Sequence, residues 1–230
     1  MLQRSNLVAA EDRGRYVPGM AQPGLVHIID DDDGVRAALA SLIRSVGNDA
    51  RLYSSAAEFL TSALPPVPSC LLLDVRLPEI NGLDFQDSLR RRGIFLPVIL
   101  MTGYGDIQMS VRGMKAGAVD FLTKPVRHQD LLDAISTALA RDRDWQRDNA
   151  EVSAIRDRHS LLTRRELEVF TLVTAGKMNK QVAGDLNLSE ITVKIHRGSV
   201  MRKMGARTLA DLVKMAELLR MAGSTTNDHH

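Results

Sequence analysis

Residues 70–74, CLLLD, decide the fold, because they form a short, wholly apolar run that ends in a carboxylate. An unbroken apolar run of this length is typical of a strand covered on both faces, as in a parallel sheet. Similar runs, separated by helical patterns, lie at residues 25–29, 50–53 (the weakest), 96–101 and 119–122. The five strand-and-helix units predict an α/β domain over residues 24–139, built on a five-stranded, parallel, doubly wound sheet.

A second compact unit, entirely helical, is predicted over residues 160–222. Thr163 and Glu166 have the spacing of a capping box and open its first helix. A short helix, with Asn179 as its expected N-cap, a tight turn and a longer helix over residues 190–204 follow. This order of elements predicts a helix-turn-helix domain.

Residues 140–159 are predicted to form a long linker helix between the two units. Their alternating Arg and Asp side chains suit a solvated helix with ion pairs along its surface. A thin apolar seam leaves a weak coiled-coil contact open as an alternative. Residues 1–23 show no periodicity and are expected to be a disordered extension or to reflect the assigned start site. Residues 223–230 are expected to be a flexible tail.

The composition narrows the class of protein. Of 230 residues, 44% are hydrophobic and 25% charged, and there is one cysteine. These values allow a real core and exclude a collagen-like, disulfide-linked or wholly disordered chain. The longest apolar run, residues 95–101, is about a third of what spans a bilayer, and the first residues lack the apolar segment of a signal peptide. We therefore expect a cytoplasmic protein without a membrane partner.

Charge is unevenly distributed between the two units. Residues 24–138 carry 11 Lys and Arg against 14 Asp and Glu, whereas residues 160–220 carry 11 against 6. A basic second unit suggests that this part of the chain meets a polyanion. Small domains reach such an imbalance by chance as well, so it supports DNA binding only together with sequence motifs.

Polar residues follow four of the predicted strands at the point where each strand ends. They are Asp30 with Asp31, Asp74, Thr102 and Lys124. The carboxyl ends of parallel strands meet at one edge of a sheet, so these side chains should lie close together. Carboxylates that share a small site repel one another unless a cation is bound, and an all-oxygen ligand set suits Mg²⁺.

The most economical chemistry for this set is transfer of a phosphoryl group to a carboxylate. Asp74, alone on the central strand, is then the nucleophile. Asp30 and Asp31 are the better metal ligands, and Lys124 supplies the opposing charge. Each residue also has a simpler explanation: acidic residues favour helix starts, and Thr102 could belong to an ordinary loop. These residues stand at the ends of separate predicted strands, and this combination favours a phosphoryl-transfer site over ordinary turn residues.

Residues 25–139 resemble the receiver domain of two-component response regulators. The matching stretches are VHIIDDDDGVR (26–36), LLLDVRLPEINGLDF (71–85), VILMTGYGD (98–106) and MKAGAVDFLTKP (114–125). The resemblance implies that Asp74 accepts a phosphoryl group from a sensor histidine kinase. It also implies that Asp31 ligates Mg²⁺ with help from Asp30, Asp74 and the backbone carbonyl of Arg76.

The same resemblance implies a switch. Thr102 and Phe121 would be the hydroxyl and the aromatic ring that reposition when Asp74 is modified. Lys124 would hold the phosphoryl group, and the bond from Lys124 to Pro125 would be cis. The protein would take part in phosphoryl transfer and self-dephosphorylation without otherwise being an enzyme.

Residues 162–213 resemble the LuxR-type helix-turn-helix of FixJ/NarL response regulators. The most specific parts are LTRRE-EV, the NK before the first helix of the motif, and TVK-H in the recognition helix. Gly198 departs from relatives that carry a longer side chain there, so operator sequence is not carried over. The resemblance implies two classes of DNA-contacting residue. Thr192 and Lys180 would touch phosphates, while Lys194, Ile195 and Arg197 would reach bases.

Together, these patterns predict a phosphorylation-dependent transcriptional regulator. Modification of Asp74 would promote dimerisation, with Val111, Met114 and Lys115 as candidate contacts, and the homodimer would bind double-stranded promoter DNA. RNA polymerase is a candidate further partner. The main alternative is a constitutive DNA-binding regulator with a non-signalling receiver. A metal-dependent phosphatase would need a second carboxylate where Arg76 stands, and a small-molecule sensor would need an apolar pocket signature that the front half lacks.

Overall fold

The computed structural model describes residues 23–78, 80–103 and 112–224. Its contacts divide the chain into two compact units between Asp142 and Arg143. Within the described ranges, no helix combines the length and the apolar character needed to cross a bilayer.

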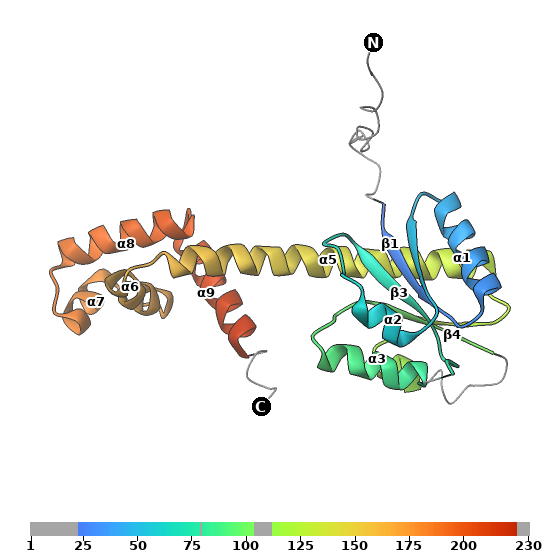
Figure 1. The fold of residues 1–230 in the computed structure, drawn as a ribbon. Helices are drawn as coiled ribbons and strands as arrows, with labels where there is room; N and C mark the ends of the chain where they lie inside the picture. The colour runs from blue at the N-terminus through green and yellow to red at the C-terminus, as the bar shows by residue number, and fades with distance from the viewer. Residues whose placement is uncertain (1–22, 79, 104–111, 225–230) are drawn as a thin grey trace, which may run out of the picture. The chain divides into compact units, whose positions relative to one another are not determined.

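A parallel five-stranded sheet forms the centre of the first unit (Figure 1). Its strands lie in the order β2-β1-β3-β4-β5, which is that of a doubly wound fold. They are β1 (Leu25–Ile29), β2 (Asp49–Tyr53), β3 (Ser69–Asp74), β4 (Val98–Thr102) and β5 (Asp120–Thr123). The predicted fold class is confirmed, and the last strand begins and ends one residue later than expected.

Helices cover both faces of this sheet, as the unbroken apolar strands require. On β3, Cys70 and Leu72 pack with α1 (Asp33–Ser45) and the first part of α5 (His128–Ser160). Leu71 and Leu73 point to the opposite face and pack with α2 (Ala56–Thr61) and α3 (Gly82–Arg91). Residues 112–115 are helical and belong to the helix expected near 106–116, whose first part lies outside the described residues.

The helix α5 is continuous over 33 residues and includes the whole predicted linker. Its buried residue Asp142 reaches the start of the central strand, where one carboxylate oxygen accepts a hydrogen bond from the backbone N–H of Ser69 at 2.7 Å. This bond joins residues 73 positions apart and satisfies an amide at the buried end of β3.

The second unit is helical, as predicted (Figure 1). Beyond the end of α5 it contains α6 (Arg164–Thr174), α7 (Asn179–Leu186), α8 (Glu190–Met204) and α9 (Leu209–Ser224). Buried aliphatic side chains from all four helices make its core. The turn between α7 and α8 contains Asn187, whose positive φ of 53° ends α7 in the left-handed conformation.

The expectation that Asn179 is the N-cap of the short helix is wrong. Met178 occupies that position with an extended backbone, and Asn179 is the first helical residue. The backbone N–H of Met178 donates to the side-chain oxygen of Gln181 at 2.9 Å, which satisfies the helix start without Asn179. The amide oxygen of Asn179 instead accepts a hydrogen bond from Arg197 of α8.

Candidate functional site

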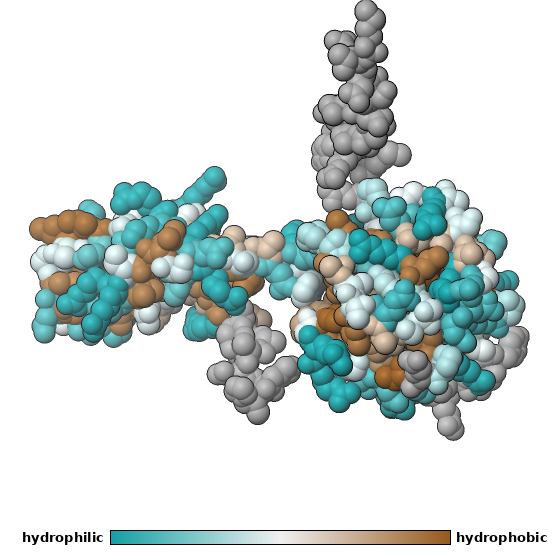
Figure 2. Space-filling model, viewed as in Figure 1, coloured by the Kyte–Doolittle hydropathy of each residue, from teal (hydrophilic) through white to brown (hydrophobic). Residues whose placement is uncertain are grey.

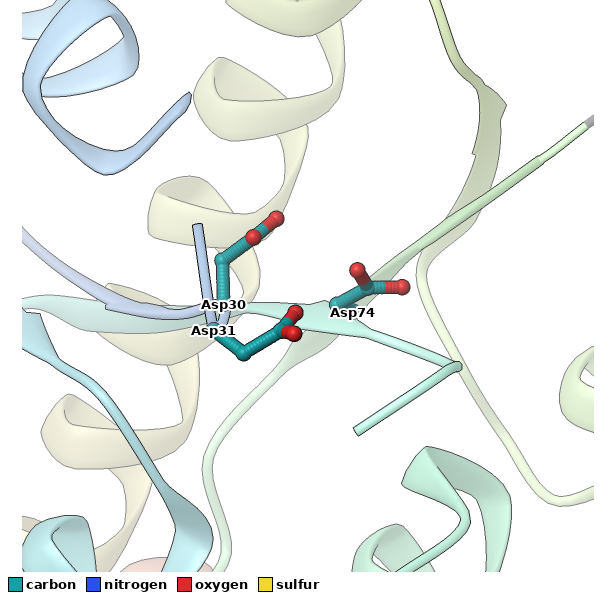
Figure 3. A group of neighbouring side chains, drawn as sticks. All are labelled: Asp30, Asp31 and Asp74. Atoms are coloured by element: carbon teal, nitrogen blue, oxygen red, sulfur yellow. The ribbon is translucent and has the colours of Figure 1, made fainter. Parts of the chain in front are cut away.

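Three carboxylates meet at the carboxyl edge of the sheet (Figure 3). Asp30 and Asp31 follow β1, and Asp74 ends the neighbouring strand β3. One oxygen from each carboxylate lies within 4.8 Å of the others. Asp30 is fully buried and Asp74 is 6% exposed, whereas Asp31 is open to solvent. The cluster therefore has two fixed members and one accessible member.

Lys124 bridges the two buried carboxylates. Its ammonium nitrogen lies 2.6 Å from Oδ2 of Asp30 and 2.6 Å from Oδ2 of Asp74. Partial burial alone would lower the pKa of Lys124, but the hydrogen bonds to Asp30 and Asp74 outweigh that effect and raise the pKa above its usual value. The ammonium therefore stays charged at neutral pH.

The remaining oxygens of the buried carboxylates are held by backbone amides. Oδ1 of Asp74 accepts from the N–H of Arg76 at 2.9 Å, and Oδ1 of Asp30 accepts from the N–H of Asp32 at 3.0 Å. These bonds fix both carboxylates in orientation before any ligand arrives. Arg76 itself lies just beyond β3, where the chain pairs with Asn81 across a narrow turn.

The donor set fits a divalent cation. Three carboxylates face one ammonium, so these four side chains carry a surplus of two negative charges. Oxygen ligands with an open, solvent-facing member suit Mg²⁺, which keeps several of its waters when bound. This acidic cluster is typical of a magnesium site, and Asp30, Asp31 and Asp74 are the residues that could hold the ion.

Gly82 is a feature of this site that the sequence analysis did not single out. A Cβ atom at this position would lie 2.6 Å from the backbone oxygen of Asp74 and 2.9 Å from Cα of Val75. Any larger residue would push the start of α3 away from the end of β3. The signal was the Asn81-Gly82 pair, in which Asn81 caps α3 and Gly82 allows the close approach.

Thr102 lies on β4, the neighbour of β3, and Phe121 lies on β5, the next strand in the sheet. Thr102 ends β4 and is fully buried, and its backbone oxygen accepts from the N–H of Lys124 at 2.6 Å. This bond ties the loop that carries Lys124 to β4. Phe121 lies on β5, half-buried, and packs against the same apolar cluster as α2 and α3.

Two of the three residues expected at a dimer contact are described. Met114 is 48% exposed and Lys115 is exposed as well. Val111 lies outside the described residues.

The residues expected to contact DNA lie on α7 and α8 of the second unit. Lys180, Lys194 and Ile195 are exposed. Thr192 is half-buried, and its hydroxyl lies 2.8 Å from that of Ser189, the N-cap of α8. Arg197 is half-buried, because its guanidinium donates to Asn179 of α7 at 3.0 Å.

A buried carboxylate, Glu166, joins α6 to one flank of α8. It accepts hydrogen bonds from Lys203 at 2.7 Å and Ser199 at 2.6 Å, and it completes the capping box with Thr163. The bond from Lys203 and then that from Ser199 lower the pKa of Glu166 to about 2. The network holds Lys203 on one flank of α8, between the buried face of the helix and the side that carries Ile195.

Comparison with known families agrees with this division of the chain. Residues 26–136 match the response regulator receiver domain, and residues 160–216 match the bacterial regulatory proteins of the luxR family. A match of this kind for the second unit identifies it as a DNA-binding helix-turn-helix.

Relatives match across both units. Nodulation protein W of Bradyrhizobium diazoefficiens is 50% identical over 88% of this chain and 89% of its own length. The transcriptional regulatory protein FixJ of Azorhizobium caulinodans is 41% identical over 86% of this chain and 93% of its own length. Among solved structures, the response regulator StyR is 39% identical, with a TM-score of 0.76 over 85% of this chain and 98% of that one.

Proposed function

Since the chain belongs to the two-component response regulators that carry a receiver domain and a LuxR-type helix-turn-helix, we propose that phosphorylation of Asp74 by a sensor histidine kinase promotes dimerisation and binding to promoter DNA. The receiver domain implies a kinase partner, and the helix-turn-helix implies DNA. The proposed limits are residues 24–139 for the receiver, 140–159 for the linker and 160–222 for the DNA-binding domain, flanked by residues 1–23 and 223–230.

The observation that carries the proposal is the placement of Asp74. It ends the central strand, accepts hydrogen bonds from the ammonium of Lys124 and the N–H of Arg76, and lies beside two further carboxylates. A carboxylate fixed on both oxygens is oriented for attack without a further ordering cost. The proximity of Lys124 and of a cation site supplies the positive charge that a phosphoryl group needs.

In the transfer step, a carboxylate oxygen of Asp74 bonds to phosphorus as the bond between phosphorus and the kinase histidine breaks, and the released imidazole keeps that electron pair. Lys124 moves its hydrogen bonds from the carboxylates to the phosphoryl oxygens. Asp30, Asp31, Asp74 and the carbonyl of Arg76 would hold a Mg²⁺ ion, which would supply positive charge to balance the phosphoryl oxygens. The chain is thus a phosphoryl acceptor rather than a classical enzyme.

The response to phosphorylation is proposed to pass through β4 and β5. The backbone bond between Thr102 and Lys124 couples any movement of the lysine to the end of β4. The Thr102 hydroxyl would turn toward the new phosphoryl oxygens, and Phe121 would fill the space it leaves. The dimer contact is proposed to lie nearby, at Val111, Met114 and Lys115.

Dimerisation would present two copies of α8 to successive half-sites of promoter DNA. Lys180 and Thr192 are proposed to contact phosphates. Lys194, Ile195 and Arg197 are proposed to reach base edges, with Arg197 oriented by its bond to Asn179.

The test is the molar mass of the full chain in solution, with and without Mg²⁺ and beryllofluoride, a mimic of the phosphoryl group. We expect a monomer that becomes a dimer only when both are present. Asp74→Asn should stay monomeric. Asp87→Asn, which neutralises an exposed carboxylate on α3, is the matched control and should dimerise like the parent.

An unchanged molar mass in the parent, with Mg²⁺ still bound, would contradict the dimer switch. If DNA binding were then also independent of Asp74, the chain would be a constitutive regulator with a non-signalling receiver.

A further inference from the structure

One face of α8 packs against the core of the second unit, and the opposite face is exposed. Val193, Val200 and Met204 are at most 1% exposed and hold α8 against the core. At about 100° of rotation per residue, Ile191, Ile195 and Gly198 lie on the opposite side of the helix. We call these three residues the apolar strip.

The apolar strip is open to solvent. Ile191 is 74% exposed and Ile195 is 66% exposed, the values expected of unpartnered surface side chains. A Cβ atom at Gly198 would meet no atom of the described chain within 4 Å, so the strip ends at an exposed position with no side chain. Figure 2 shows hydrophobic surface over the end of α8 that follows α7, with hydrophilic surface beside it.

Charges beside the strip favour a polyanionic occupant. Lys194 is exposed within the same stretch of α8, and Arg202 continues the line of the strip toward the end of the helix. Lys180 is exposed on α7, the helix that packs against α8. Cations on several sides of an apolar strip suit a duplex whose phosphates flank a groove.

Isoleucine has no hydrogen-bonding group, and it recognises DNA only through apolar contact. In the major groove the apolar group that distinguishes one base from the others is the C5 methyl group of thymine. We infer that Ile191 and Ile195, with the open position at Gly198, form a surface that reads thymine methyl groups, which makes Ile191 a specificity-determining residue beside Ile195. This inference rests on the proposed function, because it requires α8 to enter DNA.

The experiment uses the full chain with Mg²⁺ and beryllofluoride. Binding duplexes are first selected from a pool of random sequence. The affinity for a selected duplex is then compared with that for duplexes in which deoxyuridine, which lacks only the methyl group, replaces each thymine in turn. Ile191→Ser is measured in parallel. Leu161→Ser is the matched control, because Leu161 is also largely exposed, at 66% against 74% for Ile191, but lies before α6, outside the helix-turn-helix pair.

We expect one or more deoxyuridine substitutions to weaken binding by the parent roughly fourfold, the value of one buried methyl group. The Ile191→Ser variant should lose this discrimination at one or more of those positions while retaining its salt-dependent affinity. The Leu161→Ser variant should keep it.

Two results would overturn the inference alone. The first is a parent that selects a defined sequence but binds deoxyuridine and thymine duplexes equally. The second is an Ile191→Ser variant with unchanged base preference and an altered molar mass in the absence of DNA, which would make the strip a protein interface. A parent that enriches no sequence would instead contradict the proposed function, and the inference would fall with it.

Discussion

The proposed functional side chains of the first unit are mostly buried and paired with one another, whereas those of α8 in the second unit include exposed isoleucines. At the carboxylate cluster, Asp30, Asp74 and Lys124 are bonded to one another before any ligand is present. On α8, Ile191 and Ile195 stand in solvent. A small, highly charged group needs donors that are already in position, because little of its own binding energy is available for ordering them. A long duplex supplies many contacts, so the surface that binds it can remain exposed. The buried face of the same helix holds that surface in place.

A partly buried ion pair anchors each region. Lys124 holds the carboxylates together in the first unit, and Lys203 with Glu166 holds one flank of α8 in the second. The two ion pairs differ in their role. In the first unit the cation belongs to the reactive site, whereas in the second it only orients the helix that carries the site.

The largest expected effect comes from removing the first anchor. Lys124→Met leaves three carboxylates without their ammonium, so it should abolish the beryllofluoride-dependent dimer. The same change should tighten Mg²⁺ binding by about tenfold or more, because a positive charge near the ion is lost. Calorimetric titration with Mg²⁺ and molar-mass measurement test the two effects together. Weaker Mg²⁺ binding in the variant would contradict this account of the cluster.

Removing the second anchor should destabilise the protein without affecting the phosphoryl site. Glu166→Ala removes the carboxylate that accepts from Ser199 and Lys203, leaving Lys203, within the described part of the chain, only its bond to the backbone oxygen of Leu161, and should cost about 2–3 kcal/mol of unfolding free energy. The control is Glu168→Ala, which removes a partly exposed carboxylate paired with Arg164 and Arg165 and should cost less than about 1 kcal/mol. Urea unfolding followed by circular dichroism measures both. If both variants lost the same unfolding free energy, the Glu166 network would contribute no more to stability than the exposed ion pairs of Glu168.

The units should also differ in acid sensitivity. His27 on β1 is buried against Tyr53 and Phe59, and burial, followed by the charge of Arg51, lowers its pKa to about 4. The unfolded chain binds this proton more tightly, so the first unit should lose stability as pH falls from 6.5 to about 4, by about 2 kcal/mol at pH 5. Glu166, with its pKa lowered to about 2, contributes stability above pH 4.5 that is lost only as pH falls toward 2.

Calorimetric unfolding across pH 7 to 4 tests this difference. The variant His27→Leu should flatten the pH dependence of the first unit while leaving that of the second unit unchanged. A parent whose two units lose stability in parallel over this range would contradict the assignment to His27.

The smallest effect sharpens the description of the apolar strip. Gly198→Ala places a methyl group in open space within a helix and should stabilise the second unit by about 1 kcal/mol. Gly205→Ala is the contrasting change, because Gly205 has a φ of +72° and a new Cβ would lie 3.1 Å from the guanidinium of Arg158. It should destabilise the unit, and thermal unfolding distinguishes the two. A destabilising Gly198→Ala would mean that the space beside Gly198 is already occupied.

Local sequence patterns were sufficient to predict most of the fold. The apolar runs at 25–29 and 70–74 predict buried parallel strands because a covered strand has no polar alternation. The start of α8 follows from the Ser189 hydroxyl, which caps the first turn, and its end follows from Gly205, which adopts the left-handed conformation without the strain of a Cβ atom.

The features that were missed depend on contacts between distant residues. Asn179 has the chemistry of an N-cap, but its amide oxygen is taken by Arg197, 18 residues later. The role of Gly82 becomes visible only when the backbone of Asp74 is known to pass beside it. The convergence of carboxylates could be expected from strand ends, whereas the bridging position of Lys124 requires the order of β1, β3, β4 and β5 in the sheet.

The bond between Asp142 and the amide of Ser69 has a consequence for dissecting the protein. A receiver shortened at residue 139, the end that the sequence suggests, would lack the acceptor for a buried N–H at the start of β3. Leaving such a group unsatisfied costs about 1–3 kcal/mol, a sizeable part of the stability of a small domain. A fragment of the receiver, or a chimaera that exchanges DNA-binding domains, should therefore keep the first residues of the linker and be joined after Asp142.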